Sequence, residues 1–585
     1  MSEPTASLRF VADTAVQPGF DRGRMLDRLA DETFDVLVIG GGITGAGVAL
    51  DAAARGLRTA LVEADDFAVG TSSRSSKLVH GGLRYLQQGD VRLVYQALRE
   101  RKRLRRNAPH LVRILPFLIP IFAKDGLIPR RVARALGTAM WLYDLTGGWR
   151  IGKLHRRVSA DEAHRHMPTL ARDRLAGGYV YYDATVDDAR LVLTVIRTAA
   201  AHGAAAANRC RVTGFEKDAG GRVVTATIDA GDGRTLTVRA QVFVNATGVW
   251  ADDVRAWAAG TPGEPTIRPA KGVHLTVPWS LVRNDIAAVI PVPGDKRSLF
   301  VVPWGLQADG TFEHTYIGTT DTDYEGRLDD PPCTADDIDY VLHALNAAVT
   351  TGVGRDDVTG VWAGLRPLVR SAASDRTADL SRRHRVTIGA GGEIAISGGK
   401  LTTYREMAED TVDAVIEQLG GNRPRWRRVL DRAGLRRPGS GGTRSLPLLG
   451  ASGFEAVPAG SRESALADRY GTLRDKIGHL VAADPTLGEP LVPGLPYTRA
   501  EAVYAVRCEM ATTLVDVVTR RTRSHLLDRA ATLAAAPAIA DLLAAELGWD
   551  RPQRDRQLAA YEQLVAREVA DAAAPAADVA AAAAL

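Results

Sequence analysis

"DVLVIGGGITGAGVALDAAARGL", residues 35–57, is the stretch that decides the fold of this 585-residue chain. An apolar run of strand type over 34–40 ends at glycine, and a sequence of helical composition follows over 43–57. Residues 58–63, "RTALVE", form a second apolar run that is typical of a buried strand. The order strand, helix, strand predicts a β-α-β unit, and therefore an α/β domain.

The glycines of this unit have the spacing GxGxxG, through Gly40, Gly42 and Gly45. The first permits a tight turn, the second lets the backbone approach a pyrophosphate, and the third lets helix and sheet pack closely. The pyrophosphate would lie at a helix N-terminus, where free N–H groups and the helix dipole favour an anion. Glu63, which ends the second strand, would accept hydrogen bonds from ribose hydroxyls. An acid there disfavours NADP, so FAD and NAD remain.

Two later stretches indicate that the chain returns to the same crevice. "NATGVWAD" (245–252) follows a strand and ends it in Ala-Thr-Gly. "SGGKLTTYR" (397–405) has a strand end, two glycines, a cation and then hydroxyls that can cap a helix. The N-terminus of that helix could face the N1/C2=O edge of a flavin, with Lys400 stabilising negative charge on the reduced ring.

The composition is that of an ordinary soluble globular protein, with 45% apolar and 24% charged residues and a net charge of +5. The length predicts two or three domains. The three cysteines lie far apart without a CxxC pattern, which excludes a disulfide framework and predicts no metal site. The N-terminal sequence lacks the apolar core of a secretory signal, and no transmembrane helix is predicted.

One charged run has three interpretations. "RERKRLRR", residues 99–106, holds six basic residues and one acid, and the apolar run "LVRILPFLIPIF" follows at 111–122. The basic run is a solvated helix face, a contact with anionic lipid or a contact with nucleic acid. The neighbouring apolar run favours a membrane surface. Nucleic-acid binding ranks low because no aromatic residues are interleaved with the basic ones.

The whole pattern resembles the FAD-dependent glycerol-3-phosphate dehydrogenases over roughly residues 34–530. Residues 504–523, "YAVRCEMATTLVDVVTRRTR", resemble the C-terminal helical domain of that family. No CxxC follows residue 420 and there is no EF-hand loop, so the multi-subunit anaerobic and calcium-responsive forms are unlike this chain. The stretches that occur in the family's order are 35–57, "TSSRSSKLVHGGLRYL" (71–86), "NATGVWAD", "KGVHLTVP" (271–278), "IGTTDTDY" (317–324), "WAGLRPLV" (362–369) and "SGGKLTTYREMAED" (397–410).

The resemblance implies an α/β fold: a glutathione-reductase-type, Rossmann-like FAD-binding domain with a β-rich substrate cap and a C-terminal all-α domain. A Pro/Gly/Ser/Arg-rich stretch at 436–453 predicts a linker before the last of these. The expected organisation is an irregular segment at 1–30, the FAD-binding domain at 31–425 with cap segments at roughly 90–180 and 255–360, a linker at 426–455 and the helical domain at 456–585.

The resemblance also implies oxidation of sn-glycerol 3-phosphate to dihydroxyacetone phosphate, by hydride transfer from C2 to flavin N5, with electrons passing to membrane quinone. An oxidase that uses oxygen and another FAD-dependent amine or hydroxy-acid oxidoreductase are alternatives, and a nucleic-acid-binding flavoprotein ranks below them. The expected location is cytoplasmic, attached peripherally to the inner face of the membrane through anionic lipid. The expected assembly is a homo-oligomer, a dimer, with no nucleic-acid partner.

Three arginines match active-site positions of the family: Arg84, Arg366 and Arg382, of which Arg382 has an ambiguous register beside Arg383. Arginine suits a phosphate because its planar guanidinium makes multidentate contacts with phosphate oxygens. In the context of this family, His274 in "KGVHLTVP" is the candidate general base, since imidazole accepts a proton near neutrality, and Arg366 is the alternative for that role. Arg366 would orient the substrate hydroxyl, Tyr85 would shape the pocket, and Lys400 would also contact the substrate.

The loop at 72–86 would serve both molecules. Its hydroxyl and backbone donors would hold the FAD pyrophosphate and ribityl chain, and its two glycines would approach the isoalloxazine and deliver Arg84 and Tyr85 to the substrate. The expected cofactor-binding residues are Gly40, Gly42, Gly45, Glu63, Thr71, Ser72, Ser75, Ser76, Lys77, Leu78, Gly81, Gly82, Ala246, Gly248, Gly399, Lys400, Leu401 and Thr402.

Overall fold

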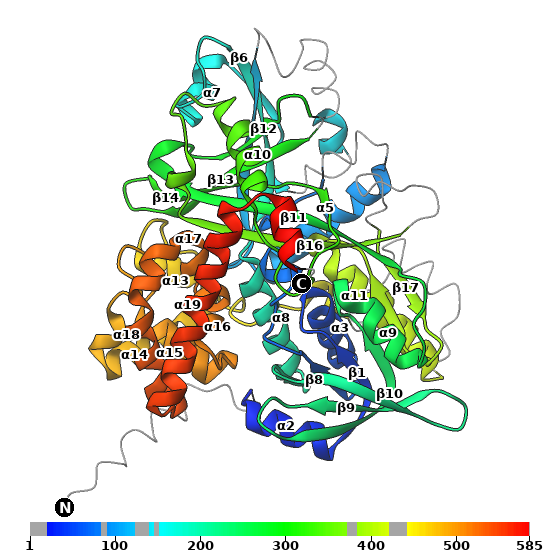
Figure 1. Ribbon diagram of the computed structural model, residues 1–585. Helices are drawn as coiled ribbons and strands as arrows, with labels where there is room; N and C mark the ends of the chain where they lie inside the picture. The colour runs from blue at the N-terminus through cyan, green and yellow to red at the C-terminus, as the bar shows by residue number, and fades with distance from the viewer. Residues whose placement is uncertain are drawn as a thin grey trace, which may run out of the picture.

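Two β-sheets and a group of C-terminal helices make up the protein, as the computed structural model shows (Figure 1). The C-terminal helices lie beside the first sheet, and α19 (Arg551–Ala573) runs from them towards the second sheet. The structure describes residues 20–82, 90–122, 140–145, 151–295, 297–370, 383–420 and 442–583.

The first sheet has the order β17-β18-β10-β1-β2-β7, with β8 and β9 continuing from β10. Strands β18, β10, β1, β2 and β7 are parallel, and β1 lies between β10 and β2. This places the carboxyl ends of β1, β2 and β10 at one edge. The strands are β1 (Thr33–Ile39), β2 (Thr59–Val62), β7 (Ala205–Ala207), β8 (Arg211–Lys217), β9 (Val223–Asp229), β10 (Thr235–Asn245), β17 (Arg385–Ile388) and β18 (Ile394–Ser397).

Helix α3 is buried on almost every side because it lies between two other helices (Figure 1). Its sequence of small and apolar residues follows from this: a Cβ on Gly47 would lie 2.8 Å from the Tyr404 ring of α11. The helices around the first sheet are α2 (Arg22–Asp31), α3 (Ile43–Ala54), α8 (Asp188–Ala201), α9 (Ala251–Ala259) and α11 (Tyr404–Gln418).

The second sheet, which we call the cap sheet, has the order β15-β11-β14-β13-β12-β4-β6-β3, with β16 on β11 and β5 on β6. It includes β3 and β16, which lie outside the ranges predicted for the cap. Helices α5 (Val91–Asn107), α7 (Ala160–His166) and α10 (Ala335–Asn346) accompany it. Its strands are β3 (Leu78–Val79), β4 (Arg113–Phe122), β5 (Arg156–Val158), β6 (Leu175–Thr185), β11 (Ile267–Pro278), β12 (Ala287–Pro291), β13 (Ser298–Leu306), β14 (Phe312–Gly318), β15 (Thr322–Asp323) and β16 (Gly360–Val369).

The run at 99–122, on which a membrane contact was predicted, is largely internal. Residues 113–122 form β4, which lies between β12 and β6, and its last six residues are buried. In the preceding helix, Arg101 is buried against Asp183 and Arg99 pairs with Glu406 at 3.4 Å. Most of the apolar residues and some of the cationic ones therefore face partners within the protein, while Lys102 and Arg106 are exposed, and a membrane contact at this run stays a prediction.

Two predicted irregular segments are ordered in part. Helix α2 begins at Arg22, where the predicted irregular segment was expected, because Asp21 accepts a hydrogen bond from Arg24 N and Leu26 and Leu29 are buried. Residues 442–453 of the predicted linker pack against the first sheet's helices: the Thr443 hydroxyl donates to Asp51 at 2.9 Å. Apolar burial and a buried polar contact override the loop-like composition there.

The C-terminal helices form a separate apolar core. Among the described helices, α18 is long and apolar enough to span a membrane by length and composition, with a mean hydropathy of 1.5, but Ile539, Ala540 and Leu543 on it are buried in that core. The helices are α13 (Arg462–Tyr470), α14 (Arg474–Ala483), α15 (Arg499–Glu509), α16 (Leu514–Asp516), α17 (Ser524–Leu527), α18 (Arg529–Leu547), α19 and α20 (Ala576–Ala583).

Candidate active site

The glycine-rich turn lies where β1, α3 and β10 converge. Gly40 has φ +108°, and a Cβ there would lie 2.7 Å from the carbonyl oxygen of Ala246, the residue that follows β10. Ala246 N donates to Ile39 O at 2.9 Å, which joins the two strand ends. A Cβ on Gly45 would collide with the carbonyl of Gly40. Side chains are thus excluded from the turn by backbone on both sides, as the dinucleotide fingerprint requires.

The N-terminus of α3 is capped from a distant loop. Gly42 is its N-cap and has no side chain to accept a hydrogen bond, and the Ser72 hydroxyl accepts from Ile43 N at 2.9 Å. A Cβ on Gly42 would lie 3.1 Å from that hydroxyl. The helix end, the small residues and the hydroxyl together fit a pyrophosphate, for which backbone N–H groups and a helix dipole are the recurring ligands.

Glu63 stands at the end of β2, beside the glycine-rich turn. Its carboxylate accepts hydrogen bonds from Gly41 N at 2.7 Å and from Asp65 N at 2.9 Å. Burial raises the pKa of Glu63 to about 7, and the nearby charges of Asp65 and Asp66 act in the same direction. The residue lies where the fingerprint predicts a ribose acceptor, and its contact with Gly41 also orders the turn. Its hydrogen bonds to a ribose stay a prediction.

Residues 71–77 connect the first sheet's helices with the cap sheet. Thr71 donates to Leu365 O of β16 at 2.5 Å. Ser75 donates from its backbone N and its hydroxyl to Asp188 Oδ2, at 2.9 and 2.7 Å. Lys77 is 2% exposed, with Nζ 3.2 Å from Asp188 Oδ1 and 4.7 Å from the centre of the Trp362 ring. The Ser75 hydroxyl and the Lys77 ammonium group therefore bind protein partners.

His274 lies on β11, 2% exposed, with Nε2 2.8 Å from the Ser76 hydroxyl. The Trp362 ring stacks on the imidazole, with a centroid distance of 4.8 Å and an interplanar angle of 8°. Burial holds the pKa of His274 well below its usual value, and the positive charges of Lys77 and Arg366 lower it further. The imidazole is consequently neutral at pH 7, the state in which it accepts a proton.

Arg366 shares a face of the cap sheet with His274. On the paired strands β11 and β16, His274 is opposite Trp362 and Ala270 is opposite Arg366, so the backbones of the two site residues are offset by four positions, about 14 Å at roughly 3.4 Å per residue. The guanidinium donates to Asp321 Oδ1 at 3.2 Å and to the Thr319 hydroxyl at 3.1 Å. This arrangement suits a substrate that has an anionic group for Arg366 at one end and, at the other, a group that can give up a proton to His274.

Two segments that were predicted to bind the cofactor, residues 397–402 and residues 80–82, are joined by a hydrogen bond. Gly398 and Gly399 have φ of +72° and +89°, and the turn they form leads through Lys400 and Leu401 into a short 3-10 helix before α11. Thr402 donates to His80 O at 3.1 Å, which joins this turn to the segment that contains Gly81. The backbone conformation explains both glycines, since residues with side chains rarely adopt it.

The glycines of the HGG segment have different structural causes. Gly81 N donates to Asp183 Oδ1 at 3.1 Å, and a Cβ on Gly81 would collide with Leu98 and Tyr143. Gly81 is therefore required by packing within the protein, a cause that the sequence does not reveal. Gly82 has φ +78°. Two other residues that were predicted to bind the cofactor are described by their backbone. Leu78 pairs with Thr185 in the cap sheet, and Gly248, after β10, has φ +65°.

Arg84, Tyr85 and Arg382 lie outside the described residues, and their roles stay predictions. Within the ranges that the structure describes, no group of three or more His, Cys, Asp or Glu side chains is arranged to hold a metal ion. Sequence reasoning missed Asp188, Trp362 and Arg523. The only signals for them were two acids at the start of a helix, a tryptophan at the start of one quoted stretch and an arginine at the end of another.

Family comparisons agree with this architecture. The family of FAD dependent oxidoreductases matches residues 35–414, and the family described as the C-terminal domain of alpha-glycerophosphate oxidase matches residues 442–554. The first match covers both sheets and the glycine-rich turn, and the second covers most of the C-terminal helices. The fold and the site thus define an FAD-dependent oxidoreductase.

Individual relatives narrow the class. The chain is 40% identical over 562 residues to glycerol-3-phosphate dehydrogenase 2 of Mycobacterium tuberculosis, covering 94% of this chain and 91% of that one. It is 37% identical over 551 residues to the mitochondrial glycerol-3-phosphate dehydrogenase of Mus musculus, covering 90% and 72%. The crystal structure of the Bacillus halodurans enzyme of that name, complexed with FAD, superposes with a TM-score of 0.70 at 29% identity, covering 94% of this chain and 97% of that one. The chain belongs to the family of FAD-dependent glycerol-3-phosphate dehydrogenases.

Proposed function

We propose that the protein oxidises sn-glycerol 3-phosphate to dihydroxyacetone phosphate and passes the electrons to a quinone. The observation that carries this proposal is the placing of a neutral, buried His274 and a cationic Arg366 on one face of the cap sheet. The names of the relatives supply the substrate, which has an anionic phosphate and a secondary hydroxyl. Bound FAD supplies the hydride acceptor for C2.

The phosphate end is bound by Arg366. Its guanidinium is half-buried and already oriented by Asp321 and Thr319, so little side-chain entropy is lost when a phosphate binds. Arg84 and Arg382 are proposed to complete the clamp, with Tyr85 shaping the pocket. Lys400, at the start of the 3-10 helix before α11, adds a positive charge on the side of the cofactor.

The hydroxyl proton leaves through Ser76 and His274. The imidazole is 2% exposed while Ser76 is only half-buried, so the serine hydroxyl is the more accessible of the pair. Ser76 Oγ accepts the proton of the substrate hydroxyl as its own proton moves to His274 Nε2 over the 2.8 Å contact. The rings of Trp362 and Tyr316 pack around the imidazole and contribute to its burial.

The proposal is tested by mixing the oxidised holoenzyme anaerobically with sn-glycerol 3-phosphate and following the flavin absorbance, with glycerol and lactate as controls. Bleaching by the phosphate ester alone is expected, because of these three compounds only it carries the phosphate that Arg366 is proposed to bind. Bleaching by lactate or an amine instead would keep the FAD fold and reject the substrate. Persistent oxidised flavin with every substrate would reject the proposed reaction.

The electron acceptor is tested separately. With a short-chain quinone, substrate oxidation is expected to reduce the quinone with no hydrogen peroxide formed. Stoichiometric peroxide under air, with no stimulation by quinone, would identify an oxidase instead. Sedimentation of the holoenzyme across a range of protein concentrations tests the proposed dimer, and a constant monomer mass would reject it.

A membrane contact fits a different surface from the one first predicted. In the helix at 140–145, Trp141 is 58% and Leu145 is 75% exposed, and Leu154 nearby is 52% exposed. The Trp141 ring lies 5.0 Å from His155, so these apolar side chains form one patch, with Arg157 exposed beside it. Aromatic and aliphatic side chains next to cations suit the inner, anionic face of the cell membrane. Co-sedimentation with anionic vesicles, reduced in Leu145→Ser, tests this contact, and full recovery in the supernatant at low salt rejects it.

A further inference from the structure

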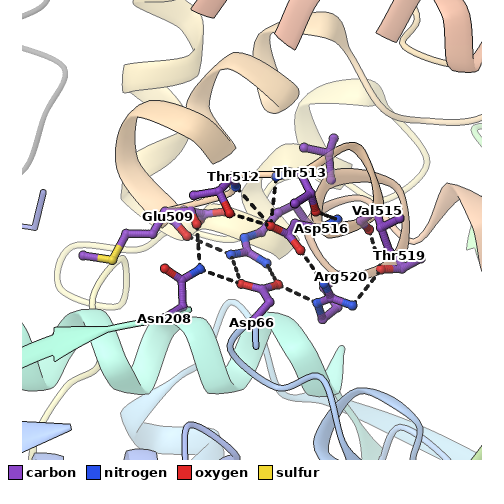
Figure 2. Close-up of polar contacts among 12 residues, drawn as sticks. Asp66, Asn208, Glu509, Thr512, Thr513, Val515, Asp516, Thr519 and Arg520 are labelled. Atoms are coloured by element: carbon purple, nitrogen blue, oxygen red, sulfur yellow. Dashed lines mark hydrogen bonds and ion pairs between the residues drawn. The ribbon is translucent and has the colours of Figure 1, made fainter. Parts of the chain in front are cut away.

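The C-terminal helices contact the first sheet's domain through buried ion clusters. In one cluster, Asp66, which follows β2, accepts hydrogen bonds from Arg521 at 2.6 and 2.8 Å and from Arg520 Nε at 2.5 Å. Figure 2 shows Asp66 and Arg520 within it, with Asp516 on the other side of Arg520. This cluster joins the two parts of the protein, and it does not include His274 or Ser76.

A second cluster, centred on Arg523, leads to the active site. Arg523 is 1% exposed and has φ +76°, a conformation uncommon for a residue with a side chain, two residues after the end of a π-helical turn (Val517–Arg521). Its guanidinium pairs with Asp188, donates to Asp187 Oδ1 at 3.0 Å and donates to Ser73 O at 3.3 Å. A residue of the C-terminal helices thus contacts the loop at 71–77 both directly and through α8.

Asp188 transmits this contact along the loop. It is fully buried, and its carboxylate accepts from the backbone N and hydroxyl of Ser75 and from Lys77 Nζ. Ser76 lies between these two residues, with its hydroxyl on His274 and its carbonyl accepting from Tyr316 OH at 3.0 Å. The residues on either side of Ser76 are therefore both held by the partner of Arg523.

The segment after Arg523 packs against the strand that carries His274. The Thr276 hydroxyl, two residues from His274 on β11, donates to Leu526 O at 2.8 Å. On β16, the Thr359 hydroxyl just before the strand donates to Leu527 O at 2.6 Å, and a Cβ on Gly360 would collide with Leu526 O. The C-terminal helices thus contact the loop that carries Ser76 and the strand that carries His274.

We propose that Arg523 is a positioning residue for the dehydrogenase reaction: through Asp188 it holds Ser76 against His274, so that the C-terminal helical domain completes the active site. Buried ion pairs suit this task because their geometry is specific and removing one partner leaves an uncompensated buried charge. A displacement of about 1 Å at the reacting groups is enough to lower turnover about a hundredfold. The inference rests on the role proposed above for Ser76 and His274.

The test compares Arg523→Gln with Arg197→Gln. Arg197 is also buried on the same interface, where it donates to Glu509 at 3.2 Å and to Tyr504 OH at 2.8 Å, but it has no contact with the loop at 71–77. Both holoenzymes are assayed at saturating FAD for kcat and KM with sn-glycerol 3-phosphate. Hydrogen exchange of the peptide that covers 72–78 is measured by mass spectrometry with and without FAD, a readout independent of turnover.

Arg523→Gln is expected to lower kcat by about ten- to a hundredfold with KM nearly unchanged, because the phosphate contact of Arg366 is intact. Exchange at 72–78 is expected to accelerate in this variant alone, and Arg197→Gln is expected to keep kcat within about twofold. Wild-type kcat and wild-type exchange in a folded Arg523→Gln would overturn the proposal. So would equal losses in both variants, which would indicate general destabilisation of the interface.

Arg523→Lys covers the case in which the glutamine variant does not fold. Lysine keeps a positive charge beside Asp188, but it lacks the planar guanidinium that contacts Asp187 at the same time. Intermediate kcat and intermediate exchange are expected, and wild-type values in both would overturn the proposal. His274→Gln tests the proton-accepting role of His274 separately from the positioning role of Arg523. If this variant keeps the wild-type kcat, the proposed base is wrong, while the exchange results still decide whether Arg523 orders the loop.

Discussion

The Ser76 hydroxyl lies 2.8 Å from His274 Nε2, and the two residues come from different parts of the fold. Ser76 belongs to the loop that caps α3, and His274 lies on β11 of the cap sheet. Their contact joins the cofactor side of the site to its substrate side.

Replacing Ser76 with alanine removes the hydroxyl through which the substrate proton reaches the imidazole. We expect kcat to fall by about a hundredfold, at the lower end of general acid–base contributions, while the flavin spectrum of the purified protein is retained. Steady-state kinetics with sn-glycerol 3-phosphate measure the change. Ser76→Thr, which keeps a hydroxyl, is the control and should lose less. Equal losses in the two variants would show that steric fit and not the hydroxyl matters.

The low pKa of His274 predicts the acid limb of the pH profile. Burial, Lys77 and Arg366 lower that pKa well below the usual value of 6.5, so the imidazole stays neutral and able to accept a proton in mildly acidic buffer. The apparent pKa of the acid limb of kcat/KM is expected below 6.5 in the wild-type enzyme, and this limb should disappear in His274→Gln. A limb that persists unchanged in the variant would assign it to another group.

Lowering the pH should also reduce stability through this histidine. Its folded-state pKa is below its unfolded-state value, so between the two the unfolded chain binds the extra proton, and the free energy of unfolding decreases as the pH falls below about 6.5. Urea unfolding at several pH values measures the slope. His274→Gln should make the slope shallower, and His110, whose pKa burial lowers to about 4, should account for part of what remains.

A substitution in the glycine-rich turn should weaken the binding of FAD. In Gly45→Ala the new Cβ collides with the carbonyl of Gly40, so helix and strand must separate and the α3 N-terminus shifts away from the pyrophosphate. We expect FAD affinity to fall at least about tenfold, measured by flavin fluorescence on titration. Gly214→Ala, in β8 of the same sheet and with open space around its Cβ, is the control. Normal affinity in Gly45→Ala would contradict the placing of the pyrophosphate.

A substitution in the Asp66 cluster should lower the free energy of unfolding (Figure 2). Asp66→Asn leaves the buried cations Arg520 and Arg521 without their shared carboxylate, which should lower the free energy of unfolding by about 3–5 kcal/mol. These arginines hold the pKa of Asp66 well below its usual range, so the wild-type contribution is present above about pH 4 and is lost as the pH falls. Urea unfolding at pH 7 measures it, with the exposed Asp541→Asn as control. A near-zero effect would mean that the interface relaxes around the missing charge.

Local patterns predicted the individual elements well. The strand at 34–40, the helix at 43–57 and the strand at 58–63 correspond to β1, α3 and β2. Their apolar periodicity and caps are properties of neighbouring residues, which the sequence displays directly. The environment of α5 was not predictable in this way, because the partners that bury Arg101 and Arg99 are Asp183 and Glu406, far away along the chain.

The sequence by itself determined the β-α-β unit and the glycine-rich turn with Glu63 at the end of the next strand, since these depend on residue types at short spacing. His274 and Arg366 became candidates through the family resemblance of the stretches that contain them. Only the tertiary structure decided what those residues contact. In the folded protein Lys77 pairs with Asp188 and the Trp362 ring stacks on His274. Arg523 contacts the loop beside Ser76, although the two residues are more than four hundred positions apart in the chain. Burial decides these contacts: a charge removed from water must find a partner, and which partner lies within reach depends on how all the elements pack.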